Sequence, residues 1–191
     1  MRLQISAFLA LTALPLASTV ADAQESSIPA TDVYAEDIQS VLENMIGVTI
    51  DRQLKIADIG GNENVAVGIL HRTGEHDTDG AHEGLVHVHI AEVYVVLSGG
   101  GMLLTGGEIF NRGELLFADD PASEGGIAIG PSYFAESRGG VVREIEEGDV
   151  VIIPAGTMHI WTQIPDHVTY LSIRIDPDQV LPAGYVNPEI N

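Results

Sequence analysis

Two histidines and a glutamate stand close together in the segment His87-Val-His89-Ile-Ala-Glu92, at a spacing that suits metal binding. Residues two apart on a β-strand point to the same face, so His87 and His89 are expected to enter the same interior. The next two residues make a tight connection, and Glu92 opens the following strand with its carboxylate turned toward both imidazoles. The segment therefore predicts three converging ligand atoms.

A second segment, from Gly148 to His159, repeats this plan far along the chain. Its apolar strand ends at a Pro-x-Gly turn, and His159 begins the strand that returns. Neutral imidazoles together with a carboxylate are strong ligands for a divalent first-row metal. We therefore predict one divalent ion, which is Mn, Fe, Ni, Cu or Zn, with one or two open coordination positions and four protein ligands: His87, His89, Glu92 and His159.

The first segment resembles the first of the two motifs of the cupin superfamily. That motif reads G, five residues, HxH, three or four residues, E, six residues, G. Its core is present here as His87, His89, Glu92 and Gly99. Ala81 stands in place of the leading glycine, and the gap between the second histidine and the glutamate is two residues.

The second family motif reads G, five residues, PxG, two residues, H, three residues, N. The chain matches it with Gly148, Pro154, Gly156 and His159, and has Gln163 in the last position. The resemblance covers about residues 60 to 176, and it implies a jelly-roll β-barrel, commonly dimeric, with the metal inside near one end. It implies no particular reaction, because cupins include dioxygenases, decarboxylases, isomerases, lyases and non-catalytic binding proteins.

Alternation along the strands predicts further residues around the metal. Tyr94 follows Glu92 by two residues and shares its face, as Trp161 and Gln163 share the face of His159. Such a mixed aromatic and amide lining suits a small organic ligand, and ordinary core packing is the alternative, favoured for Trp161.

Two more candidates come from other strands. His71 continues the alternation of Val65, Val67 and Ile69, so it joins Tyr94 as a candidate catalytic residue, with a histidine at the barrel rim as the alternative. Arg174 would bind a substrate carboxylate if it points inward beside Ser172, and an outward salt bridge is the alternative.

The elements around these motifs predict an all-β protein, a cupin jelly-roll β-barrel with an N-terminal amphipathic helix. Short β-branched and aromatic segments, punctuated by Gly, Pro, Asn and Asp, favour a barrel over a parallel α/β sheet. Apolar residues at three- and four-residue steps predict a helix over 31–46, capped by Thr31 or Asp32 and packed on the barrel or on a second subunit. The predicted organisation is an N-terminal extension (24–59) that carries this helix, a barrel (60–176), and an extended tail along a neighbouring subunit (177–191).

The first 23 residues read as a signal peptide. An apolar stretch from Leu3 to Leu16 precedes the small-x-small site Ala21-Asp22-Ala23, and it is too short and interrupted for a membrane span. We therefore expect a periplasmic or secreted protein, cleaved near Ala23. The absence of cysteine excludes a disulfide framework and a lipid-modified N-terminus.

The charge of the chain limits its partners. A formal net charge of −20 repels phosphate backbones and anionic lipid, so nucleic acid and membranes are not expected partners. The expected partners are a small-molecule substrate and a second copy in a homodimer. These features predict a metal-dependent small-molecule enzyme, either an oxygenase or a Lewis-acid decarboxylase, isomerase or lyase. The alternative is a non-catalytic protein that binds a small molecule through its metal.

Overall fold

The computed structural model describes residues 28–45, 49–74, 82–118 and 128–190. The predicted signal peptide (1–23) lies outside these ranges. Within them, no helix is long and apolar enough to cross a membrane.

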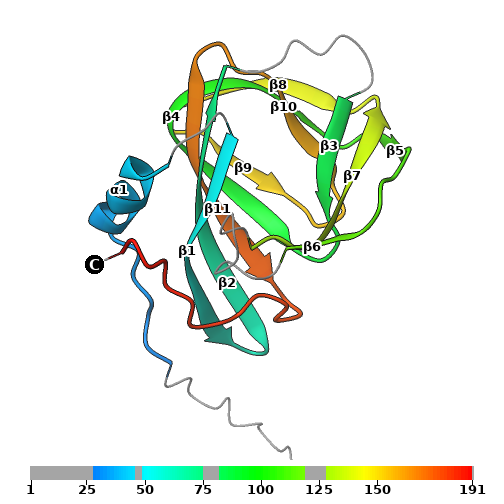
Figure 1. Ribbon diagram of the computed structural model, residues 1–191. Coiled ribbons are helices and arrows are strands. Elements are labelled where there is room, and N and C mark those ends of the chain that lie inside the picture. The colour runs from blue at the N-terminus through cyan, green and yellow to red at the C-terminus, as the bar shows by residue number, and fades with distance from the viewer. Residues whose placement is uncertain (1–27, 46–48, 75–81, 119–127, 191) are drawn as a thin grey trace, which may run out of the picture.

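The described residues form one curled antiparallel β-sheet with a single short helix outside it (Figure 1), which confirms the all-β jelly-roll class. The main path of the sheet runs β1-β2-β11-β4-β10-β3-β7-β5, with β6 on β7 and with β8 and β9 on β4. The elements are α1 (Ala35–Glu43), β1 (Thr49–Gly60), β2 (Glu63–Thr73), β3 (His82–His87), β4 (Ala91–Thr105), β5 (Glu108–Phe110), β6 (Leu116–Ala118), β7 (Gly130–Arg138), β8 (Val141–Glu146), β9 (Val150–Ile153), β10 (His159–Gln163) and β11 (His167–Asp176).

The long strand β4 joins the two halves of the barrel. Its first part pairs with β11 and β9, and its second part pairs with β10 and β8. The change from the first set of partners to the second lies at residues 99–101. Here the chain comes so close to its neighbours that a side chain at Gly100 would meet the carbonyl oxygen of Ile145. Glycine there lets one strand serve both halves, which curls the sheet around an interior.

Helix α1 is shorter than the predicted 31–46 and packs on the outside of the barrel. Its N-cap residue is Tyr34, neither Thr31 nor Asp32, and the carboxylate of Asp37 accepts the Tyr34 backbone N–H at 3.0 Å. Its apolar stripe covers Leu54 of β1 and Ile69 of β2. The helix and the outer face of these two strands therefore enclose a second, smaller hydrophobic core.

The sheet begins at Thr49, inside the stretch predicted as an N-terminal extension. Strand β1 pairs with β2 along its whole length, with a register shift between Gln53 and Lys55. Its inward side chains at Asp51 and Gln53 are polar, so the apolar alternation that reveals a strand is missing there.

The C-terminal tail lies along β1 of the same chain, where the sequence predicted a neighbouring subunit. Leu54 accepts the Asn187 backbone N–H at 2.8 Å, and Tyr185 accepts that of Ile56 at 3.0 Å. The side chain of Leu181 is buried beside Ile56 and Ile90. The tail therefore covers an edge of the sheet and part of the interior.

Candidate metal centre

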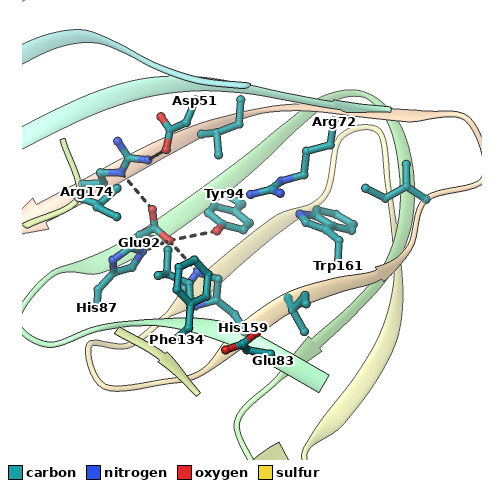
Figure 2. A pocket seen from close by; sticks show the side chains of 16 residues that line it. Asp51, Arg72, Glu83, His87, Glu92, Tyr94, Phe134, His159, Trp161 and Arg174 are labelled. Atoms are coloured by element: carbon teal, nitrogen blue, oxygen red, sulfur yellow. Dashed lines mark hydrogen bonds and ion pairs between the residues drawn. The ribbon is translucent and has the colours of Figure 1, made fainter. Parts of the chain in front are cut away.

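Three side chains from three strands converge inside the barrel. His87 ends β3, Glu92 lies near the start of β4, and His159 starts β10. The Nε2 atoms of His87 and His159 lie 3.1 Å and 3.3 Å from Oε2 of Glu92. All three side chains are buried, and one ligand atom of each lies within 4.8 Å of the others. Figure 2 shows the three around one carboxylate oxygen.

A close approach of two backbones holds His159 against its neighbours. His159 pairs with Leu85 of β3 on one side and with Thr105 of β4 on the other. A side chain at Gly84 would collide with the sulfur of Met158 and the carbonyl oxygen of His159. Glycine at position 84 therefore lets β3 lie against β10, which brings both imidazoles to the same place.

Hydrogen bonds on the far side of each imidazole determine which nitrogen carries the proton. The hydroxyl of Ser132 donates to the carbonyl of Gly130 (3.1 Å), so it accepts from Nδ1–H of His87 (2.8 Å). Nδ1–H of His159 donates to the carbonyl of Thr157 (3.1 Å). Burial lowers the pKa of His87, which favours its neutral ring.

These tautomers direct the lone pairs of both Nε2 atoms toward the Glu92 carboxylate. Two lone pairs and an anionic oxygen repel one another at about 3 Å unless a cation lies among them. Metal-binding histidines commonly donate the other ring N–H in this way. The donor set therefore fits a divalent metal ion, held by His87, Glu92 and His159.

Glu92 is fixed as a carboxylate by three donors. Its Oε1 accepts Ser172 Oγ–H at 2.6 Å and Arg174 Nε–H at 3.1 Å, and its Oε2 accepts Tyr94 O–H at 3.1 Å. Burial alone would raise the pKa of Glu92, but its charged neighbours, among them Arg174, hold it well below its usual range. The residue is therefore charged at neutral pH and ready to bind a cation.

Arg174 points inward beside Ser172, but its role differs from the predicted one. Its Nη1 donates to Gln53 Oε1 (3.1 Å) and to the carbonyl of Ala128 (3.0 Å), and its Nη2 binds Asp51. Gly68 leaves room for it, because a side chain there would come within 3.2 Å of Nη1. Each of its nitrogens has an acceptor in the protein, so Arg174 positions Glu92 and is not set to bind a substrate carboxylate.

His89 does not reach the group, which corrects the prediction of four ligands. Strand β3 ends at His87, and the chain bends at the next two residues, so the alternation stops before His89. Its side chain is 51 % exposed, with Nδ1 3.1 Å from Oδ2 of Asp178. Three protein ligands, and not four, therefore converge.

Two of the other predicted lining residues lie elsewhere. A register shift between Trp161 and Gln163 turns Gln163 to the surface, and Ile164 lines the cavity in its place. His71 is on the outer face of β2, together with Ile69, which packs under α1. Its Nδ1 lies 2.8 Å from Thr169 Oγ1, and its ring stacks 5.8 Å from that of His167. A catalytic role of His71 at the metal group is therefore excluded by its position.

Tyr94 and Trp161 do line the interior, in a cavity of about 360 Å³ that opens from the metal group. Burial, with Glu92 next to it, raises the pKa of Tyr94 well above its usual range, so this phenol stays protonated. Sequence reasoning missed Arg72, which also lines the cavity, together with Asp51 and Ser132. Alternation along β2, where Arg72 follows Leu70 by two residues, was the available signal for Arg72.

Comparison with known proteins concerns the fold alone. No family model matches the sequence, and no curated protein matches it. Similar solved structures include a Bacillus halodurans protein, BH2720 (17 % identity, 83 % of this chain and 89 % of that one, TM-score 0.41). They also include oxalate oxidase in complex with glycolate (16 % identity, 70 % of this chain and 53 % of that one, TM-score 0.37). A third is a Klebsiella pneumoniae protein with a double-stranded β-helix domain (15 % identity, 68 % of this chain and 80 % of that one, TM-score 0.30). At these identities and scores the similarities give no information about substrate or reaction.

Acidification is expected to release the metal and lower the melting temperature together. The pKa values of His87 and Glu92 are lower in the folded protein than their ordinary values, 6.5 and 4.5. Their contribution to stability is therefore complete above those ordinary values and is lost as the pH falls below them, through the lower pKa values of the folded protein. Protons also compete with the ion for each histidine.

The measurement is melting temperature and bound metal as a function of pH in the metal-loaded protein. We expect both to be constant above about pH 7 and to fall together toward about pH 5. A chelator at neutral pH should lower the melting temperature similarly, and the right ion should restore it. A protein that has lost its metal at neutral pH and still melts at the same temperature would contradict the link between metal and fold.

Proposed function

Since the chain has the cupin fold with a buried His–Glu–His group inside its barrel, we propose that it is a metal-dependent enzyme that acts on a small organic molecule. The observation that carries the proposal is the convergence of two imidazole lone pairs on one carboxylate oxygen at the end of a cavity. A first-row divalent ion with three protein ligands keeps positions open for a substrate or for dioxygen. The ion would there supply Lewis-acid or oxygenase chemistry.

The residues of the chain itself supply orientation, a proton and a shielded cavity. Ser132 and the carbonyl of Thr157 hold the two imidazoles, and Arg174 holds the carboxylate. The hydroxyl of Tyr94 stays protonated beside Glu92 and is the candidate proton donor of the cavity. The ring of Trp161 gives the cavity an apolar wall, which excludes water from that side.

A second candidate is a protein that binds a small molecule through its metal without turnover. Among the described residues of the cavity, Asp51 and Glu92 are bound to Arg174, and the raised pKa of Tyr94 disfavours a role as base. The cavity thus offers an acid but few bases apart from Glu83, which is exposed. The two candidates differ in turnover alone.

The test is metal analysis followed by a substrate screen. Protein purified without added metals is expected to carry close to one first-row divalent ion per chain. The metal-free and reloaded forms are then screened against small organic molecules. Turnover that needs the ion supports the enzyme, and ion-dependent binding without turnover supports the binding protein. Protein without bound metal that also takes up none would contradict both. Export and a homodimer stay predictions from the sequence.

A further inference from the structure

The cavity that opens from the metal group contains a second arginine, Arg72. On β2, Arg72 pairs with Val168 of β11, whereas Ala66 of the same strand pairs with Arg174 beside Glu92. Six residues of strand separate these two positions, which is about 20 Å of backbone. Both arginines line the cavity, and the guanidinium of Arg72 is directed toward Tyr94, whose hydroxyl donates to Glu92 (Figure 2).

Arg72 is held by aromatic side chains and not by a carboxylate. Its Nε donates to the hydroxyl of Tyr170 at 3.1 Å. The Tyr170 ring in turn lies 4.4 Å from that of Tyr94 and 5.7 Å from that of Trp161, between ring centroids.

The terminal nitrogens of Arg72 are available to a ligand. In the described part of the chain, neither Nη1 nor Nη2 of Arg72 has a hydrogen-bond acceptor or an ion-pair partner. Of the three carboxylates that line the cavity, Asp51 and Glu92 are bound to Arg174, and Glu83 is exposed. Arg72 is therefore a cation without a counterion among these residues, although the chain as a whole is strongly acidic.

The indole ring of Trp161 belongs to the same wall of the cavity. Its side chain is 5 % exposed, and its Nε1–H is buried without an acceptor among the residues that the structure describes. A buried polar group without a partner destabilises the folded protein, but this atom is also closed off from the cavity, so it is not a contact for a ligand. Arg72 is the donor that a ligand can reach, so the complementary ligand is an acceptor with negative charge.

We infer that Arg72 binds a carboxylate of the substrate inside the cavity that opens from the metal group. The substrate is then a small carboxylic acid whose apolar body lies along Tyr94 and Trp161 and whose other end faces the metal. A planar guanidinium binds a carboxylate through two parallel hydrogen bonds, which makes Arg72 the residue that selects this class. The inference rests on the proposed function for the role of the bound acid as substrate, but the binding of the acid is testable by itself.

The test uses the fluorescence of Trp161, the single tryptophan of the chain, as a reporter within the cavity. Metal-loaded protein is titrated with hexanoate and phenylacetate, and with hexanamide and phenylacetamide as neutral counterparts. We expect both acids to bind at least tenfold more tightly than their amides. Arg72→Gln should weaken the acids at least tenfold and leave the amides unchanged, and Arg72→Lys should fall between. Arg138→Gln, which removes an exposed arginine, should bind as the unmodified protein does.

The outcomes separate this inference from the metal site. Each variant is first analysed for metal, and a full complement shows that the barrel and its ligands are intact. Equal affinity of Arg72→Gln and the unmodified protein for the acids overturns the inference, as does failure of both acids to bind. Binding that is kept in Arg72→Gln and lost with the metal would place the carboxylate on the ion and also overturn it. Protein that takes up no metal and still binds the acids through Arg72 would contradict only the proposed function.

Discussion

Replacing His87 or His159 with alanine is expected to lower the affinity for the divalent ion by more than about a hundredfold, whereas His89→Ala leaves it unchanged. Each of the first two changes removes one of three converging ligands, and even the loss of an outer partner typically costs about 10–100-fold. His89 is a matched control, because it lies two residues from His87 but pairs with Asp178 at the surface.

Metal content after dialysis against a weak chelator, followed by titration with Zn²⁺, measures this effect. Ser132→Ala should lie between the ligand variants and the unmodified protein, about 10–100-fold weaker, because it frees Nδ1 of His87 to take the wrong tautomer. Loss of metal in His89→Ala equal to that in His87→Ala would show that four ligands act, as the motif predicts, and that the three-ligand group is incomplete. Full metal content in His159→Ala would refute the site.

Arg174→Met is expected to destabilise the metal-free protein by about 3–5 kcal/mol, the usual cost of removing one partner from a buried ion pair. Arg174 is 1 % exposed and binds Glu92 and Asp51, whose charges would lose their counterion. Methionine fills much of the same volume, so the loss is electrostatic more than a matter of packing. This single residue thus connects the metal group to β1.

Urea unfolding of the metal-free variants measures the difference. Arg138→Gln controls for the loss of a positive charge on an acidic chain, because Arg138 is exposed and lies over the ring of Phe110. Adding Glu92→Gln to Arg174→Met should recover part of the loss, since it removes one of the two uncompensated charges. A change below about 1 kcal/mol in Arg174→Met would mean that water reaches these carboxylates in place of the guanidinium.

Local pattern was sufficient for the parts of the site that lie on uninterrupted strands. Glu92 and Tyr94 are two residues apart on β4, as are His159 and Trp161 on β10, and all four side chains enter the interior. Strand alternation and turn residues act within a few residues, so a single sequence contains them. The same reasoning led to an all-β barrel with an outer helix.

Local pattern failed where a strand ended or shifted. The bend after His87 carries His89 to the surface, and the register shift after Trp161 does the same to Gln163. His71 shows a different ambiguity: both faces of β2 are covered, one by α1 and the other by the cavity wall, so apolar alternation does not tell inside from outside.

The contacts of Arg174 and Arg72 depend on pairing between strands that are far apart in the sequence. The sequence by itself determined the all-β class, the ligand types and the acidic character of the chain. Only the tertiary structure decided that Arg174 holds Glu92 and that Arg72 has no ion-pair partner among the residues that the structure describes. The physical reason is that Asp51 and Gln53, which bind Arg174, lie more than a hundred residues away in sequence. Only the pairing of β1, β2 and β11 brings them together. A pattern of neighbouring residues in the sequence does not show which charged side chains will form ion pairs in the fold.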